Sequence, residues 1–246
     1  MKEDKEMIAM LFAAGLGTRL KPFTDKRPKA MTEINGKTLL QHNIEYLQKF
    51  GIKKVVINVH HFADQIVKAI DENKGWGSEI IISDESNEVL ETGGGLLKAA
   101  TFFYGYKNIV LMNVDVLTNL NLDEMIENHI SSNALATLAV SKRTTSRYFI
   151  FNKQNELCGW MNTNTNEKKG VENFDLEKHQ QLAFSGIHII QTKMLSFIKR
   201  VGKFSLVDVY LDLMKAHTIK AFDHSNDIFI DVGKPESLAI AAKLFK

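Results

Sequence analysis

The chain is poor in three features that would place it in a special class of protein. It has one cysteine, three prolines and no long apolar run in 246 residues. Cys158 alone cannot form an internal disulfide or a cysteine-based zinc site, so we expect a reducing compartment and a cytoplasmic location. The charged start MKEDKE and the short apolar run Met7–Ala14 suit neither a signal peptide nor a membrane span. We therefore expect no membrane partner.

The chain also lacks an excess of either charge. It carries 31 Lys and Arg against 29 Asp and Glu, a formal net charge of +2. This balance argues against a nucleic-acid partner, whose binding face would be dominated by basic residues. The basic residues instead gather in one short segment with a single acid, Asp25. They are Arg19, Lys21, Lys26, Arg27 and Lys29. Such a cluster suits a small anionic ligand.

Strand and helix patterns alternate through the first half. β-branched or fully apolar strands are expected at Met7–Ala14, Lys54–Val59, Glu79–Ile82, Asn108–Met112 and Ala134–Val140. Amphipathic helices are expected after Thr38, at Phe62–Ile70 and at Leu122–Ile130. This alternation predicts an α/β fold, a Rossmann-like three-layer α/β/α sandwich with a mostly parallel mixed sheet. Residues 1–246 are expected to form a single domain.

The second half is more irregular. Tyr148–Phe151 and Glu156–Trp160 flank a polar turn and predict a β-hairpin insertion, followed by a mobile loop at residues 161–170. A strand at Leu182–Ile190 is interrupted by Ser185-Gly186. Further segments are expected as helices at Lys193–Arg200 and Ser205–Ala216, strands at Ile219–Phe222 and Ile228–Gly233, and a last helix from Pro235.

A glycine turn follows the first strand. In Gly15-Leu16-Gly17-Thr18-Arg19, backbone N–H groups can face a bound phosphate without a Cβ in the way. A dinucleotide fingerprint would need a glycine where Leu20 stands, and a P-loop ending at Thr38 would need one at Met31. The remaining pattern, G-x-G-T-R followed by Pro28-Lys29, indicates a triphosphate site.

Two carboxylates and a glycine cluster complete the candidate site. Asp115 follows the strand at 108–112, and Asp231 ends the strand at 228–231. Ligands of open α/β sheets bind at the carboxyl ends of strands, and Mg²⁺ accepts one or two carboxylates beside phosphate oxygens. Gly93, Gly94 and Gly95 are expected in a polar loop just before a helix, where a ligand could approach the backbone.

These motifs together resemble the sugar-1-phosphate nucleotidylyltransferases, also called nucleoside-diphospho-sugar pyrophosphorylases. The resemblance covers nearly the whole chain through FAAGLGTRLKPFTDKRPKAM, ETGGGLLKA, NVDVLTN, FSGIHII and IDVGKPESL. Within the family the ETGGG form is most similar to the uridylyltransferases that act on N-acetylmuramate 1-phosphate in cell-wall recycling. Guanylyl transfer to mannose 1-phosphate, thymidylyl transfer to glucose 1-phosphate and cytidylyl transfer to phosphocholine stay open. A non-catalytic nucleotide-sugar sensor and a dehydrogenase are less favoured.

The resemblance implies the reaction and the site. An oxygen of the sugar 1-phosphate attacks the α-phosphorus of a nucleoside triphosphate, UTP being favoured, and pyrophosphate leaves. Asp115 and Asp231 would hold Mg²⁺, Arg19 and Lys29 would be catalytic, and Asn113, Ser185 and Gly186 would bind the sugar phosphate. The implied nucleotide-binding residues are Phe12, Ala13, Ala14, Gly15, Leu16, Gly17, Thr18, Glu85, Glu91, Thr92, Gly93 and Gly94.

The chain departs from the family pattern at Val114, where glycine is usual, and at Phe229, where tryptophan is frequent. A monomer or small homo-oligomer is expected.

Overall fold

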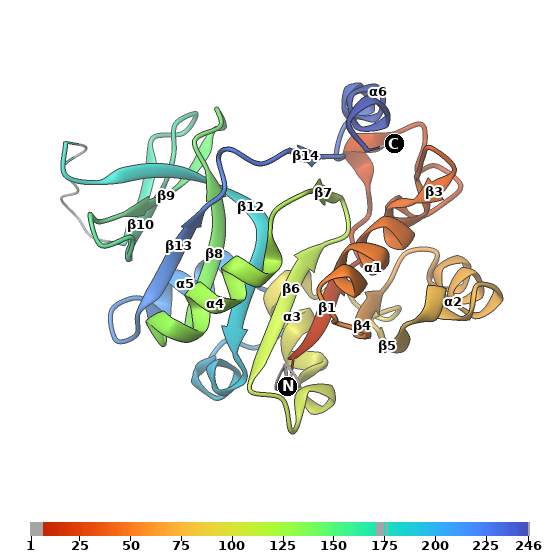
Figure 1. Ribbon diagram of the computed structural model, residues 1–246, viewed down its shortest axis with the longest axis horizontal. Coiled ribbons are helices and arrows are strands. Elements are labelled where there is room, and N and C mark those ends of the chain that lie inside the picture. The colour runs from red at the N-terminus through yellow and green to blue at the C-terminus, as the bar shows by residue number, and fades with distance from the viewer. Residues whose placement is uncertain (1–6, 171–174, 176, 246) are drawn as a thin grey trace.

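The computed structural model describes residues 7–170, 175 and 177–245, which form a central mixed sheet with helices on both faces (Figure 1). Its strands are β1 Met7–Phe12, β4 Lys54–Val59, β5 Glu79–Asp84, β6 Asn108–Asn113, β8 Ala136–Ser141, β9 Arg147–Phe151, β10 Leu157–Asn162, β11 Glu167–Gly170, β12 Gln180–Gln191 and β13 Ile219–Asp223. Two small two-stranded sheets pair β2 Glu33–Ile34 with β3 Lys37–Thr38, and β7 Val116–Thr118 with β14 Phe229–Asp231.

The helices form two layers. They are α1 Leu39–Lys49, α2 Ala63–Glu72, α3 Glu91–Lys98, α4 Leu122–Ser132, α5 Leu206–Leu213 and α6 Pro235–Leu244. Apolar residues of α1, α2 and α4 share one hydrophobic core with one face of the sheet. Those of α3 and α5 share a second core with the other face. The predicted three-layer α/β/α arrangement is therefore confirmed. Among the residues described, no helix is long and apolar enough to cross a bilayer.

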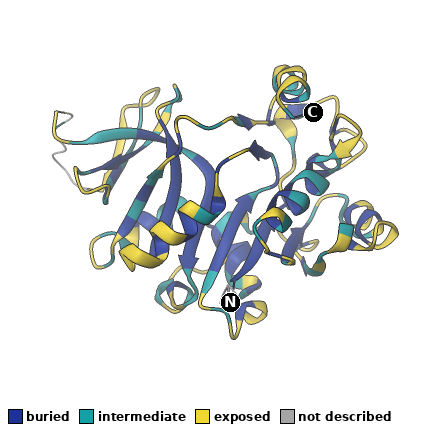
Figure 2. Ribbon diagram, viewed as in Figure 1, coloured by how far each residue is buried: buried dark blue, intermediate teal, exposed yellow. Residues whose placement is uncertain are grey.

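The first strand lies at the centre of the sheet because its side chains are apolar on both faces. β1 runs parallel to β4 and β6, with Leu11 opposite Ile57 and Met112. Ala9 and Leu11 enter the core beneath α1, and alternate residues such as Met10 enter the other core. Figure 2 shows these central strands buried while the outer faces of the helices are exposed. A strand buried on both faces is the usual centre of a parallel sheet.

One antiparallel strand sets the direction of the second half. β12 pairs antiparallel with both β6 and β8, and β13 runs parallel to β8. The strands β6 and β8 therefore point the same way. Their carboxyl ends lie at one edge of the sheet with those of β1, β4, β5 and β13, and that edge carries the candidate site.

The interruption predicted within β12 is a bulge. Pairing with β8 shifts register between Phe184 and His188, and Gly186 adopts a left-handed φ of 72°. A Cβ on Gly186 would lie 2.7 Å from Nδ2 of Asn113, so the side chain that approaches the backbone here comes from β6.

Two local predictions are wrong. Residues 161–170 are mostly strand: β10 continues to Asn162, a four-residue turn spans 163–166, and β11 pairs antiparallel with β10, Met161 facing Lys168. All residues of β11 are exposed, so the backbone ladder forms although no apolar alternation marks the strand. The segment predicted as a helix at Lys193–Arg200 is a 3₁₀ turn at Thr192–Phe197.

The predicted position of the three consecutive glycines is also wrong. Gly93, Gly94 and Gly95 lie inside α3, which begins at Glu91, and all three are buried. A Cβ at Gly93 would collide with the Phe204 ring, one at Gly94 with the Gly202 carbonyl oxygen, and one at Gly95 would lie 2.5 Å from Oε1 of Glu85. The glycines therefore allow α3 to pack closely against neighbouring protein segments.

We predict that Gly94→Ala destabilises the fold. Alanine normally stabilises a helix interior by about 1 kcal/mol relative to glycine, but overpacking against backbone costs about 1–3 kcal/mol. Thermal unfolding should show a lower Tm. Gly15→Ala is the matched control for stability, because a Cβ there meets nothing within 4 Å. A Gly94→Ala variant with an unchanged or higher Tm would contradict the packing argument.

Candidate active site

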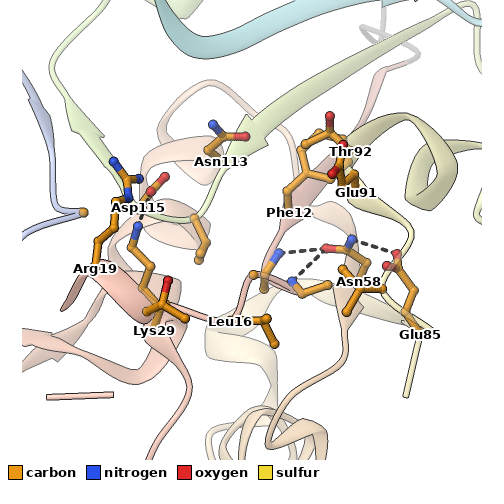
Figure 3. A pocket seen from close by; sticks show the side chains of 18 residues that line it. Phe12, Leu16, Arg19, Lys29, Asn58, Glu85, Glu91, Thr92, Asn113 and Asp115 are labelled. Carbon is orange, nitrogen blue, oxygen red and sulfur yellow. Dashed lines mark hydrogen bonds and ion pairs between the residues drawn. The ribbon is translucent and has the colours of Figure 1, made fainter. Parts of the chain in front are cut away.

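A cavity of about 370 Å³ opens at the carboxyl edge of the sheet, between the glycine turn after β1 and the ends of β4, β5 and β6 (Figure 3). Arg19, Lys29 and Asp115 lie on one side of it, and Asn58 and Glu85 lie on the other. Its lining residues are Phe12, Ala13, Ala14, Gly15, Leu16, Gly17, Thr18, Arg19, Lys29, Asn58, Glu85, Val89, Glu91, Thr92, Asn113, Val114, Asp115 and Gly233.

The glycine turn offers unpaired amide groups to this cavity. The N–H groups of residues 15–18 form no hydrogen bond with any part of the chain that the structure describes. Gly17 has a φ of 64°, and a Cβ there would lie 3.0 Å from Cγ2 of Thr24 and 3.2 Å from Cβ of Lys29. Its carbonyl accepts a 2.8 Å hydrogen bond from Oγ1 of Thr24. Thr24 thus holds the turn in place, and residues 15–18 line the cavity with amide donors that no described group of the protein uses, an arrangement that suits an anion.

Lys29 and Asp115 form an ion pair on one side of the cavity. Nζ of Lys29 donates a hydrogen bond to Oδ2 of Asp115, and the two side chains are 11% and 16% exposed. Lys29 begins a 3₁₀ turn directly after Pro28, and Asp115 follows β6. The pair is partly shielded from water, so its Coulomb attraction is stronger than that of a surface pair.

Asp231 is brought to the same place by β14. Asp231 faces Val116 in the β14–β7 ladder, and the Val232 amide donates a 2.8 Å hydrogen bond to the Asp115 carbonyl. The Asp231 carboxyl and Arg19 both lie over Gly233, where a Cβ would be 2.5 Å from Oδ1 and 3.1 Å from Nη2. Loss of hydration, and then the charge of Asp115, raises the pKa of Asp231 against the opposing effect of three cations, Lys29, Arg19 and Arg143.

The two carboxylates fit a divalent cation. Within the described residues no group of three or more His, Cys, Asp or Glu side chains could form an all-protein metal cage. Mg²⁺ does not need one, because it binds through one or two carboxylates together with phosphate oxygens and water. Beside the loss of hydration, repulsion from Asp115 contributes to the raised pKa of Asp231, and a bound divalent cation would relieve that repulsion.

Asn58 holds the opposite side of the cavity in place through hydrogen bonds. Its Oδ1 accepts hydrogen bonds from the amides of Ala13 at 2.7 Å and Ala14 at 3.3 Å, and its Nδ2 donates to Oε1 of Glu85 at 2.8 Å. The amides of Ala13 and Ala14 are therefore already used. Burial raises the pKa of Glu85, while hydrogen bonds from Asn58 and the Leu90 backbone oppose this rise. Glu85 is buried in the cavity wall, and its second carboxylate oxygen, Oε2, has no hydrogen-bond partner among the described residues.

The sequence of the chain matches the profile of a known protein family. The profile of the family described as "Nucleotidyl transferase" matches residues 8–246. The chain belongs to the nucleotidyl transferase family. The resemblance found in the sequence motifs is thereby confirmed.

Relatives within the nucleotidyl transferase family differ in substrate. N-acetylmuramate alpha-1-phosphate uridylyltransferase of Caulobacter vibrioides is 44% identical over 110 residues, 44% of this chain and 45% of the relative. D-glycero-alpha-D-manno-heptose 1-phosphate guanylyltransferase of Campylobacter jejuni is 29% identical over 94% of this chain and 96% of its own length. The matches to the catalytic subunit beta of mannose-1-phosphate guanylyltransferase of Drosophila melanogaster and to the Caulobacter protein span less than two thirds of those relatives.

The fold is shared with a solved structure. HddC from Yersinia pseudotuberculosis complexed with GMP-PN superposes with a TM-score of 0.77 at 24% identity, covering 97% of this chain and 99% of that one. This likeness supports the nucleotide-diphospho-sugar transferase type of α/β fold predicted from the sequence.

Most of the residues predicted from the sequence converge on the cavity. Those outside its lining are Gly93, Gly94, Ser185, Gly186 and Asp231. The Ser185 hydroxyl is buried and hydrogen-bonded at 2.7 Å to Nε2 of His224, which leaves it little freedom to bind a ligand. Sequence reasoning missed Asn58, the polar residue near the carboxyl end of the otherwise apolar β4. The strand-end rule that found Asp115 would also have found it.

We predict that Asp231→Asn stabilises the metal-free protein at neutral pH. A carboxyl whose pKa is raised by folding favours the folded state at low pH, and this contribution is lost as pH rises from the ordinary value of 3.8 through the raised pKa. The Tm advantage of Asp231→Asn should therefore shrink as pH falls toward 3.8. Asp71→Asn on exposed α2 is the control. A less stable Asp231→Asn protein at neutral pH would contradict the charge assignment.

Asn58→Ala should destabilise the protein by about 2–3 kcal/mol, because two buried amides and Glu85 lose their partner together. Chemical denaturation would measure the change. Asn73→Ala is a matched control that removes one hydrogen bond at a helix end and should cost about 1 kcal/mol or less. Equal effects of the two substitutions would argue against a special role for Asn58.

Proposed function

We propose that the chain transfers a nucleotidyl group from a nucleoside triphosphate, with UTP favoured, to a sugar 1-phosphate, with N-acetylmuramate 1-phosphate favoured, and releases pyrophosphate. The observation that carries this proposal is the cradle of unpaired amides at residues 15–18 facing Lys29, Asp115 and Asp231. Donors and cations for a triphosphate thus stand beside the carboxylates that suit its metal ion.

The chemistry needs little from the protein beyond position and charge. The attacking oxygen belongs to a phosphate monoester that is largely ionised at neutral pH, so no side chain has to remove a proton. Residues 15–18 and Arg19 would hold the β- and γ-phosphates, so that pyrophosphate leaves in line. Lys29 would turn from Asp115 to the α-phosphate as negative charge grows there. Mg²⁺ held by Asp115 and Asp231 would neutralise charge on the reacting phosphates.

Glu85 is the residue that we expect to select the base of the nucleotide. An ionised Glu85 is an acceptor, and uracil, thymine and guanine each present a ring N–H to such a group. Cytosine and adenine present a lone pair at the matching ring nitrogen, which an acceptor repels. The acceptor therefore favours UTP, dTTP and GTP over CTP and ATP. UTP is the favoured member because the Caulobacter vibrioides relative, at 44% identity, is named a uridylyltransferase.

The choice of sugar 1-phosphate rests on the relatives. Two relatives named N-acetylmuramate alpha-1-phosphate uridylyltransferase, at 44% and 36% identity over parts of the chain, support N-acetylmuramate 1-phosphate. That substrate would assign the protein to cell-wall recycling in the cytoplasm. The heptose 1-phosphate guanylyltransferase that matches almost end to end makes GTP with a manno-configured sugar the second candidate.

The proposal is tested by a substrate matrix read out as pyrophosphate. UTP, dTTP, GTP, CTP and ATP are each combined with the 1-phosphates of N-acetylmuramate, N-acetylglucosamine, glucose, mannose and D-glycero-D-manno-heptose. We expect the highest kcat/KM for UTP with N-acetylmuramate 1-phosphate. Turnover confined to GTP would move the substrate assignment to the guanylyltransferases. Tight nucleotide-sugar binding without any turnover would instead indicate a sensor.

Asp115→Ala and Asp231→Ala should each abolish pyrophosphate release at saturating Mg²⁺ while leaving the circular dichroism spectrum unchanged. Each removes a carboxylate that would hold the metal. Asp115 lines the cavity and is partly exposed, and Asp231 is exposed beside it, so neither belongs to the hydrophobic core. Asp71→Ala, on the exposed face of α2, is the matched control and should keep wild-type turnover. Full turnover in either cleft variant would refute the metal assignment.

A further inference from the structure

Arg143 is a third cationic side chain, after Arg19 and Lys29, near the two carboxylates, and it lies outside the lining of the cavity. Arg143 follows β8 by two residues, at the same edge of the sheet as Asp115. It acts electrostatically on Asp231, lowering the pKa of that carboxyl together with Lys29 and Arg19. Nothing in its sequence context, SKRTTSRY, marks it as different from the exposed basic residues around it.

The Arg143 guanidinium is held in place by two contacts. Nη2 donates a 2.6 Å hydrogen bond to the Phe184 carbonyl, beside the β12 bulge whose Gly186 packs on Asn113. Its central carbon lies 5.0 Å from the centre of the Phe229 ring, and Phe229 precedes Asp231 by two residues in β14. One contact ties Arg143 to the Asn113 side of the site and the other ties it to the Asp231 side.

These contacts leave most of its hydrogen-bonding capacity unused. A guanidinium has five N–H donors. Nε is buried and has no partner, and Arg143 forms no ion pair with any residue in the described part of the chain. A carbonyl and an aromatic ring orient the group without neutralising its charge. Arg143 therefore stands as an oriented, uncompensated cation at the rim of a negatively charged site.

The place of Arg143 separates it from the cations that face the triphosphate. Lys29 pairs with Asp115, whereas the carboxylate that acts on Arg143 is that of Asp231. It lies further along the edge toward β8 and β9, away from Asn58 and Glu85. A sugar whose phosphate met the metal at Asp115 and Asp231 would extend over this region.

We infer that Arg143 is a specificity-determining residue that binds a carboxylate on the sugar ring of the substrate and so selects acidic sugar 1-phosphates over neutral ones. This inference rests on the proposed function and deepens it. The planar fork of arginine matches a carboxylate in a two-point hydrogen bond. N-acetylmuramate 1-phosphate differs from N-acetylglucosamine 1-phosphate only by a lactyl ether that ends in such a carboxylate.

The test compares these two sugars at saturating UTP in the wild-type enzyme, Arg143→Gln, Arg143→Lys and the matched control Arg147→Gln, which removes an exposed charge on the same segment. Arg143→Gln should lower kcat/KM for N-acetylmuramate 1-phosphate about 10- to 100-fold, the range for a charged hydrogen-bonded contact. The value for N-acetylglucosamine 1-phosphate and the KM for UTP should stay within about 3-fold. Arg143→Lys should give an intermediate loss, and Arg147→Gln should change neither sugar.

Three results would overturn the inference. The first is an equal loss of kcat/KM for both sugars in Arg143→Gln, which would assign Arg143 to the shared phosphate. The second is no loss of kcat/KM for either sugar in that variant. The third is a wild-type enzyme that does not prefer the acidic sugar. Pyrophosphate release with any sugar 1-phosphate upholds the proposed transfer reaction in all three cases. Failure of the inference and failure of the proposed function are therefore told apart by the same assay.

Discussion

The ion pair between Lys29 and Asp115 is the interaction on which the charge balance of the site depends. A half-buried carboxylate (Asp115), an exposed one (Asp231) and a buried lysine share one edge of the sheet, and a buried charge is far less stable alone than paired. Lys29 neutralises Asp115 in the protein without ligands, and Asp231 keeps a raised pKa. A metal ion with its triphosphate would exchange these partners: the carboxylates would receive the metal, and the lysine would be released to a phosphate.

The fold brings the two carboxylates together through the direction of β6 and one small antiparallel ladder. Asp115 follows a strand of the first half, and Asp231 reaches it through the β14–β7 ladder. The antiparallel β12 lets β6 and β8 point the same way, so the edge continues from Glu85 after β5, past Asp115, to Arg143 after β8. The nucleotide half and the sugar half of the proposed substrate pair would thus share one row of strand ends.

The sequence allowed the main features of the site to be predicted where the signal is local. β1 is apolar throughout, the glycine turn follows it at once, and Asp115 stands directly past a buried strand. The strand-end position of Asn58 is a local signal that the strand-end rule covers, whereas its hydrogen bond to Ala13 and the contact of Arg143 with Phe184 join segments far apart in the chain and have no local pattern. β11 was missed because both its faces are polar and exposed, and backbone pairing needs no side-chain pattern. The three consecutive glycines predict close approach of a ligand, but the groups that approach them, Phe204 and Gly202, belong to another segment of the protein itself.

The cation on Asp115 should change from Lys29 to a metal when substrate binds, and a single structure can test this exchange. A crystal structure of the full chain with Mg²⁺ and a non-hydrolysable UTP analogue would show it. We predict one Mg²⁺ ligated by Asp115 and Asp231, with Nζ of Lys29 moved from Asp115 to the α-phosphate. A bound nucleotide with the Lys29–Asp115 pair intact, or a metal that touches neither carboxylate, would contradict the account.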